Sequence, residues 1–315
     1  MILKIGTRGS KLALAQSAWI KEGIQKQNPS IRVDLVKIKT TGDKILDSPL
    51  STIGGKGLFV KEIEEALFRK EIHVAVHSMK DLPAELPEGL ALAVFPERED
   101  PRDAFISTDG TRLEALPQGA RVGTGSLRRV AQLRHRRPDL EVVPLRGNVD
   151  TRLKKLETEG LQGIVLAVAG LRRLGLEHLM TQVISSRWIL PAVGQGALGL
   201  EVREDDGQSL EVLHFLNHWP TEAAVKTERA FLKELQGGCQ VPIAGFASLK
   251  EDQLFFQGMV ASIDGSRVFQ DQMTGPKDEA ADIGVSVARR LLGLGAREIL
   301  AEIYGKSPVD VSQPG

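Results

Sequence analysis

Three kinds of side chain in this sequence could do chemistry: one thiol, one carboxylate and a group of arginines. Cys239 is the only cysteine among 315 residues, and it follows Gly237 and Gly238, which let the backbone turn freely. A lone thiol is most often a small buried hydrophobe, so spacing alone leaves a structural and a reactive interpretation of Cys239 open.

The carboxylate is Asp81, which follows a predicted strand in the segment SMKD at 78–81. Open α/β sheets bind ligands and place reactive groups at such strand ends. A carboxylate beside Lys80 can stay ionised and stabilise a developing cation. An aspartate just before Leu82 and Pro83 can equally cap N–H groups of a turn, and both interpretations stay open.

The arginines gather in one part of a neutral chain. Lys plus Arg and Asp plus Glu both total 41, yet residues 121–155 hold ten basic residues and three acidic ones. This segregation favours a discrete anion site over general basicity. Arg128, Arg129, Arg146 and Arg152 lie near expected strand ends or helix starts, where guanidinium groups can bind a polycarboxylate or a phosphate. By contrast, a solvated helix face is the better interpretation of three other arginines of the segment, Arg134, Arg136 and Arg137.

Composition and simple patterns argue against several classes of protein. Aromatic residues make up 4% of the chain, which leaves few stacking platforms and disfavours a nucleic-acid partner. The longest apolar run, 164–171, is far shorter than the ~20 residues of a membrane span. The first residues read as a strand, so we expect a cytosolic protein without a membrane partner. His214 and His218 lack a third ligand, so we expect no metal site.

These side chains must be positioned by alternating strands and helices. A first unit is predicted as strand 2–5, a helix from Ser10 to about Gln27 with an apolar stripe of Leu12, Ala15, Trp19 and Ile20, strand 31–39, a long loop over 40–57, helix 58–69 and strand 72–76. This alternation predicts an α/β domain with mostly parallel strands.

A second α/β unit follows the charged connection 97–103. The predicted strands of this unit lie near residue 122, at 141–145 and at 163–168. Its predicted helices start at Ser126 and span 148–158. Strand 197–202 is then predicted to return to the first domain. A third, α+β unit is predicted from strands at 242–248, 252–260 and 267–273 and a helix at 278–292. The expected domains are 1–98 with 197–216, then 102–190, and 219–315.

The first two units share a weak sequence echo. IGTRGS at 5–10 and VGTGS at 122–126 each join a strand, a Gly-Thr turn and a serine at a helix start. Two helix N-termini that face each other across a cleft would bind an anion between them. Good capping chemistry alone also explains the pattern.

Motifs along nearly the whole chain resemble those of the porphobilinogen deaminase (hydroxymethylbilane synthase) family. The matching segments are GGKGLF at 54–59, VAVHSMKDLP at 74–83, EREDPRD at 97–103, SLRR at 126–129, LRGNV at 145–149, AVAGL at 167–171, PAVGQG at 191–196 and GGC at 237–239. The fold that this resemblance implies is α/β: two mixed-sheet α/β domains flanking a cleft (periplasmic-binding-protein-like), plus a smaller α+β C-terminal domain with the cofactor loop.

The resemblance implies head-to-tail condensation of four porphobilinogen molecules with loss of ammonia, in tetrapyrrole biosynthesis. It also implies a dipyrromethane cofactor held by a thioether to Cys239, and Asp81 beside the pyrrole nitrogens as the catalytic carboxylate. The clamps for cofactor and substrate that it implies are Arg8, Ser10, Lys80, Thr124, Ser126, Arg128, Arg129, Arg146, Arg152 and Arg173, with Lys56, Phe59 and Gln195 as further cofactor-binding positions. We expect a monomer with a small-molecule substrate.

Two positions depart from the family pattern. Gly125 stands where many members have Ser or Ala, and Thr52 stands where some have Lys. The competing interpretation is a non-catalytic anion receptor, since a two-domain cleft with arginines also suits solute binding. Cys239 discriminates between the two, because a receptor has no use for a thioether-held pyrrole.

Overall fold

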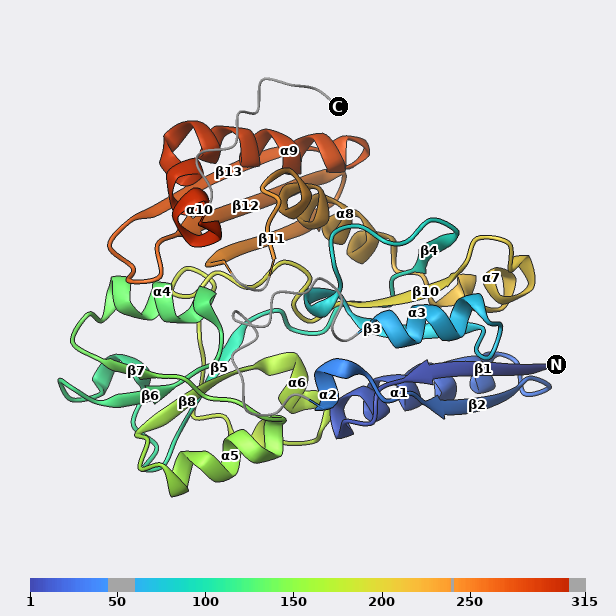
Figure 1. Ribbon diagram of the computed structural model, residues 1–315, viewed down its shortest axis with the longest axis horizontal. Helices are drawn as coiled ribbons and strands as arrows, with labels where there is room; N and C mark the ends of the chain where they lie inside the picture. Colours follow the sequence, from blue (N-terminus) through green and yellow to red (C-terminus); the bar gives the residue numbers. More distant parts are fainter. Residues whose placement is uncertain (45–59, 239–240, 306–315) are drawn as a thin grey trace.

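The computed structural model describes residues 1–44, 60–238 and 241–305, which form three β-sheets in three lobes (Figure 1). The strands are β1 (Ile2–Thr7), β2 (Arg32–Lys37), β3 (Val74–Ser78), β4 (Leu90–Val94), β5 (Asp103–Ser107), β6 (Arg121–Gly123), β7 (Glu141–Val143), β8 (Gly163–Ala167), β9 (Gln182–Val183), β10 (Leu198–Arg203), β11 (Ile243–Lys250), β12 (Gln253–Ala261) and β13 (Val268–Pro276).

The helices lie between these strands and after them. They are α1 (Lys11–Gln27), α2 (Thr41–Lys44), α3 (Lys61–Phe68), α4 (Leu127–Arg136), α5 (Val149–Thr158), α6 (Val168–Arg173), α7 (Gly207–Leu213), α8 (Trp219–Glu234), α9 (Ala280–Leu291) and α10 (Arg297–Tyr304). Single turns are η1 (Met79–Asp81), η2 (Leu113–Ala115), η3 (Glu177–Leu179), η4 (His214–Leu216) and η5 (Lys277–Glu279), and η6 (Leu292–Ala296) joins α9 to α10.

The first sheet has the strand order β2-β1-β3-β10-β4. Strand β1 runs parallel to β2 and β3, whereas β10 runs antiparallel to β3 and β4. Ser10 starts α1, because its hydroxyl accepts a hydrogen bond from the backbone N–H of Ala13 at 3.2 Å. Helix α1 then buries Ile20 and Ile24 against strand residues that include Leu3.

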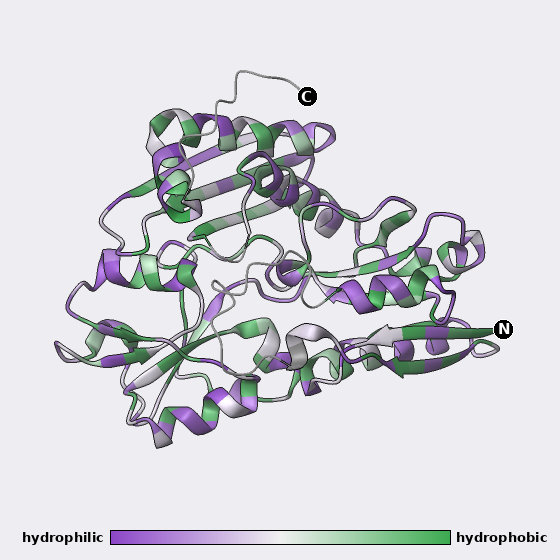
Figure 2. Ribbon diagram, viewed as in Figure 1, coloured by the Kyte–Doolittle hydropathy of each residue, from purple (hydrophilic) through white to green (hydrophobic). Residues whose placement is uncertain are grey.

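The second sheet repeats this arrangement. Its order is β7-β6-β8-β5-β9, with β6 parallel to β7 and β8, and with β5 antiparallel to β8 and β9. Strands β1 and β6 therefore occupy equivalent places, and these are the two strands that carry the sequence echo. Strand β8 is buried over most of its length and is mainly green in Figure 2, as expected for a strand covered on both faces.

Two crossings join the first two lobes, and the strand after each crossing is the antiparallel one. The first crossing runs from β4 to β5 and the second from β9 to β10. The strand predicted at 197–202 is present as β10, between β3 and β4 in the first sheet. The expected fold class, two mixed α/β domains and a small α+β domain, is confirmed. The exact domain boundaries stay predictions.

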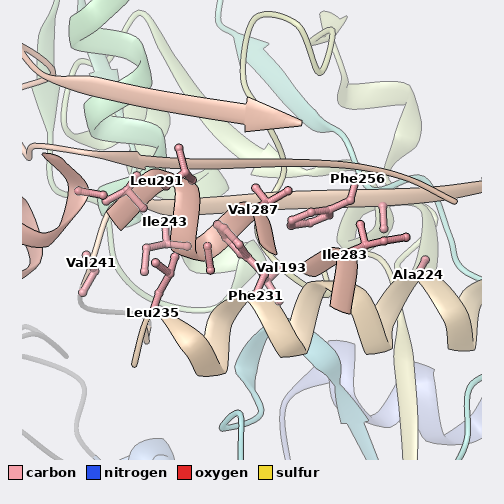
Figure 3. Close-up of a cluster of buried hydrophobic side chains, with 14 of the residues drawn as sticks. Val193, Ala224, Phe231, Leu235, Val241, Ile243, Phe256, Ile283, Val287 and Leu291 are labelled. Carbon is pink, nitrogen blue, oxygen red and sulfur yellow. The ribbon is translucent and has the colours of Figure 1, made fainter. Parts of the chain in front are cut away.

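The third sheet, β11-β12-β13, is antiparallel and is covered on one face by α8 and α9 (Figures 1 and 3). Phe231 of α8 meets Phe256 of β12 edge to face, with 5.0 Å between the ring centroids. The two helices cross closely at Gly284, where a Cβ would lie 2.2 Å from the carbonyl oxygen of Thr227. Glycine is therefore required at this crossing.

Two local predictions are wrong. Trp19 does not belong to the buried stripe of α1, since it is 49% exposed and the buried face carries Gln16 and Ser17 instead. The loop predicted over 40–57 contains α2 at its start, because Glu62 accepts hydrogen bonds from both the N–H and the hydroxyl of Thr41. Positions 45–57 of that predicted loop lie outside the described residues.

A buried carboxylate ties both crossings to the third lobe. Glu228 of α8 is fully buried and accepts hydrogen bonds from the guanidinium of Arg98 at 2.6 and 3.2 Å. It also accepts from the backbone N–H groups of Gly194 at 2.6 Å and Ala247 at 2.8 Å. Arg98 belongs to the first crossing and Gly194 to the second. Glu228 therefore fixes the point where the three lobes meet.

We expect Glu228→Gln to destabilise the fold strongly. The change leaves the guanidinium of Arg98 buried without its carboxylate, which costs about 3 kcal/mol in the free energy of unfolding. The control is Lys233→Gln on the same helix, where an exposed ion pair with Glu85 is lost and the cost stays below about 1 kcal/mol. Urea denaturation measures both. Equal losses in the two variants would show that Glu228 does not anchor the lobes.

Candidate functional site

A cleft of about 690 Å³, including its open mouth, lies between the first two lobes. Its walls come from the start of α1, the end of β3 with η1, and α6 of the second lobe. The residues that line it are Arg8, Ser10, Leu12, Ala13, Gln16, Val60, Ile63, Val76, His77, Ser78, Lys80, Asp81, Ala167, Ala169, Gly170, Arg173 and Gly196.

Five of the site residues expected from the sequence meet in this cleft: Arg8, Ser10, Lys80, Asp81 and Arg173. Lys80 and Asp81 form the turn η1 directly after β3, so the end of this strand delivers both into the cleft. Asp81 is exposed and Lys80 is half-buried. The structure thus brings the predicted carboxylate together with three predicted cationic groups.

Burial destabilises the charged forms of Lys80 and Arg173 and so lowers their pKa values. The pKa of Lys80 is lowered by burial and by the charges of Arg129 and Arg152, against the opposing effects of Asp81 and Asp103. Burial also lowers the pKa of Arg173 to about 10. Both interactions of Lys80 with arginines reach across to the second lobe, so the charges of the two walls act on one another.

Arg146 and Arg152 of the second lobe are not among the residues that line the cleft, but the charge of Arg152 acts on Lys80. Burial, Arg129 and Arg146 together lower the pKa of Arg152 to about 10, although Asp81 opposes the shift. Arg152 also donates from Nε to the carbonyl oxygen of Gly147 at 2.8 Å. At neutral pH these guanidinium groups remain charged and repel each other, which makes the region between the walls favourable for an anion.

Arg128 and Arg129 lie deeper, and both pair with Asp103 at the start of β5. Arg128 Nη2 lies 2.8 Å from Asp103 Oδ2, and Arg129 donates from Nε and Nη2 to Asp103 Oδ1 at 3.1 and 2.7 Å. All three residues are at most 4% exposed. Burial raises the pKa of Asp103, but Arg128 and Arg129 outweigh it and hold that pKa at about 2. Asp103 is therefore ionised at neutral pH.

Thr124 and Gln195, two further predicted positions, form hydrogen bonds within the protein. The hydroxyl of Thr124 accepts from the N–H of Ser126 at 3.3 Å, just before α4. Gln195 is 1% exposed and gives its amide to Pro101 O at 2.6 Å and to Asp103 Oδ1 at 2.9 Å. At Gly125, a Cβ would lie 2.5 Å from Leu145 O, so a side chain at this position requires a shift of the backbone.

Arg134, Arg136 and Arg137 lie at the far end of α4 and contact the main chain near them. Arg136 is exposed and donates to the carbonyl oxygens of Trp188 and Arg187. Arg137 pairs with Asp139 and also donates to nearby carbonyl oxygens. This separates them from the cleft, in line with their interpretation as residues of a helix face.

Cys239, Lys56, Phe59 and Thr52 lie outside the described residues. The approach to Cys239 is described as far as Gly238. Gln236, not a glycine, takes the left-handed conformation after α8, with φ 49°. At Gly237 a Cβ would lie 2.5 Å from Ile243 Cδ1, so this glycine permits a close approach of two segments and does not itself make the turn.

Sequence reasoning missed several residues of the site. Gln16 is buried, lines the cleft and stands on the face of α1 that also carries Ile20, so a polar residue on an apolar face was the available signal. Asp103 had no such signal, because it stands among five other charged residues at 97–103. His77 also lines the cleft and forms a buried 2.7 Å contact with Glu201.

The donor set fits a polycarboxylate such as the dipyrromethane group. The half-buried cations Lys80, Arg152 and Arg173 have lowered pKa values, and Arg128 Nε is buried without a hydrogen-bond partner in the described structure. Carboxylates supplied by a ligand would satisfy such groups. Within the described residues, no set of three His, Cys, Asp or Glu side chains is placed to hold a metal ion. None of the helices described is long and apolar enough to span a membrane.

Comparison with known proteins assigns nearly the whole chain to one family. Residues 3–211 match the family model of the porphobilinogen deaminase dipyromethane cofactor binding domain, and residues 223–293 match that of the porphobilinogen deaminase C-terminal domain. Porphobilinogen deaminase from Trichlorobacter lovleyi is 54% identical over 96% of this chain and 96% of its own length. Porphobilinogen deaminase from Geobacter sulfurreducens is 54% identical over 96% of this chain and 95% of its own length.

Solved structures give a looser likeness. The periplasmic aliphatic sulphonate binding protein from Escherichia coli aligns with 98% of this chain and 79% of its own, at 12% identity and a TM-score of 0.39. A score of this size supports no conclusion about ligand or mechanism. The family models and the curated relatives agree with each other, and the chain belongs to the porphobilinogen deaminase family.

Proposed function

We propose that this chain joins four porphobilinogen molecules head to tail, with loss of ammonia from each, to give hydroxymethylbilane. This is a transferase reaction of tetrapyrrole biosynthesis. The observation that supports it best is the composition of the cleft: Asp81 stands at the end of β3 among cations from both walls. Family membership supplies the name of the reaction, and this arrangement supplies a physical reason for it.

Substrate binding follows from charge. Porphobilinogen has an acetate and a propionate group, which suit guanidinium and hydroxyl donors. We assign Arg8, Ser10 and Arg173 to these carboxylates, because all three line the cleft beside Asp81. Burial of the cations strengthens the attraction, since solvent screens charges less inside the cleft than at the surface.

Asp81 has two tasks in this proposal. When the C–N bond of the aminomethyl group breaks, the electron pair stays with nitrogen, which leaves as ammonia after taking up a proton. The carbon left behind becomes a cation conjugated with the pyrrole ring, and the carboxylate of Asp81 stabilises it. Formation of the new carbon–carbon bond releases a proton from a ring carbon, which the same carboxylate can accept.

The dipyrromethane group, when bound, supplies the fixed pyrrole end from which the product chain grows. We assign its attachment to Cys239, and its carboxylates to the basic and hydroxyl groups of the second wall and of η1. These are Lys80, Thr124, Ser126, Arg128, Arg129, Arg146 and Arg152, with Lys56, Phe59 and Gln195 as further positions. We also propose that the protein is a cytosolic monomer that binds no nucleic acid.

An anion receptor is the alternative function, since a cleft lined with arginines suits it too. The two differ in covalent chemistry. We expect the intact mass of the wild-type chain, produced in cells that make tetrapyrroles, to exceed the sequence mass by one dipyrromethane. Cys239→Ser removes the attachment point and should return the mass to that of the sequence. A wild-type chain of unmodified mass would favour the receptor.

We expect Asp81→Asn to fold normally and to lose about 1000-fold or more in kcat, because the neutral amide neither stabilises the cation nor accepts a proton. Porphobilinogen consumption measures the rate, and thermal melting checks the fold. The control is Asp34→Asn on β2 of the same lobe, where only a surface pair with Arg32 is lost and the rate should stay unchanged. Turnover near the wild-type rate in Asp81→Asn would remove Asp81 from the mechanism.

A further inference from the structure

We propose that Asp103 is a positioning residue of this site: its buried carboxylate holds Arg128 and Arg129 side by side and sets which of their N–H groups can reach a carboxylated ligand. The proposal rests on the function assigned above and adds a residue that sequence reasoning did not select. Asp103 acts through the two arginines and makes no contact with ligand itself.

A count of hydrogen-bond donors shows what Asp103 controls. Arg129 has five N–H donors and uses three: Nε and Nη2 to Asp103 Oδ1, and Nη1 to Val165 O at 3.0 Å. Within the described residues, two donors of Arg129 are left for a ligand. Arg128 gives Nη1 to Leu190 O at 2.6 Å and pairs through Nη2 with Asp103, while its buried Nε makes no hydrogen bond to any described residue. Asp103 therefore fixes how both guanidinium groups are turned.

Electrostatics explains why a carboxylate is needed at this point. Two guanidinium groups at consecutive positions of α4 are both almost fully buried, so their repulsion is poorly screened by solvent. One carboxylate neutralises half of this charge and leaves one positive charge for the ligand. Without Asp103 the two arginines would move apart or towards solvent. The wall would then keep its charge and lose the spacing of its donors.

Three separate segments fix Asp103 itself. It begins β5, where it pairs with Ala167 of β8, and it accepts from α4 through the arginines. It also accepts from Gln195 Nε2 of the second crossing at 2.9 Å, and the same amide holds Pro101 O of the first crossing. A side chain held from β5, α4 and the second crossing has little freedom to move, which is the property that a positioning residue requires.

The test is a double-mutant cycle with Asp103→Asn and Arg129→Gln in the full-length enzyme. The measured quantity is kcat/KM for porphobilinogen. Asp103→Asn alone should lose about 100-fold, the usual cost of misplacing binding groups by about 1 Å. Arg129 makes two hydrogen bonds to Asp103, whereas Arg128 is also held by Leu190 O, so most of the effect of Asp103 should pass through Arg129. The double variant should then stay within about 3-fold of Arg129→Gln alone. The control Asp139→Asn breaks a similar pair with Arg137 on the same lobe and should change kcat/KM less than about 3-fold.

Two results would overturn the proposal: activity of Asp103→Asn within about 3-fold of wild type, or a double variant about 10-fold or more below Arg129→Gln alone. If Asp103 has only a structural role, the fold-losses in kcat/KM of the two single variants should multiply in the double variant. Each loss should then be accompanied by a lower melting temperature. If Asp103→Asn does not fold, the comparison of the double variant with Arg129→Gln still decides, because the double variant removes one charge of each sign.

A failure of the proposed function is seen separately, as a wild-type enzyme that does not consume porphobilinogen. In that case the same variants are compared, in the Cys239→Ser chain, for binding of benzene-1,2,4,5-tetracarboxylate by calorimetry. Asp103→Asn should then weaken binding about 10-fold or more, and the double variant should match Arg129→Gln. Equal affinity in the Cys239→Ser chain with and without Asp103→Asn, or no binding to either, would overturn the positioning role.

Discussion

Buried positive charge without enough acid to balance it is the constraint on which this structure depends. Lys80, Arg152 and Arg173 all have pKa values lowered by burial, and Asp81 and Asp103 compensate only part of the charge around them. Such an arrangement does not stabilise the folded state by itself, because desolvation of a cation costs free energy. A ligand with several carboxylates restores the balance. The site is therefore suited to a polyanion, and Asp81 lines the same cleft as Lys80 and Arg173.

The fold supplies this arrangement by repeating one strand order twice. In both sheets a central strand, β1 or β6, leads into a helix that starts at a serine, Ser10 or Ser126. After each crossing the chain forms the one antiparallel strand of the sheet that it enters, β5 in the second sheet and β10 in the first. Glu228 anchors both crossings to α8, the helix that precedes Gly237 and Gly238. The third lobe is thus joined directly, through α8, to the segments that connect the first two lobes.

Much of this could be predicted from sequence, for physical reasons that differ between residues. Alternating elements indicated the α/β class, and motif resemblance assigned Arg8, Lys80 and Asp81 to one site, where the structure places them together. Burial patterns were less reliable: Trp19 is exposed although it lies near the apolar stripe of α1. The roles of Asp103 and Glu228 could not be predicted, because their partners lie 19 to 130 positions away and only tertiary folding brings them near.

The most direct measurement of the central claim is the intact mass of the wild-type enzyme during brief incubation with limiting porphobilinogen. The account predicts a ladder of masses, each step equal to one porphobilinogen less ammonia, because the cationic cleft retains the growing polyanion until the product is complete. One unchanging mass while porphobilinogen is consumed, or no consumption at all, would contradict the claim that this cleft holds a growing chain of carboxylated pyrroles.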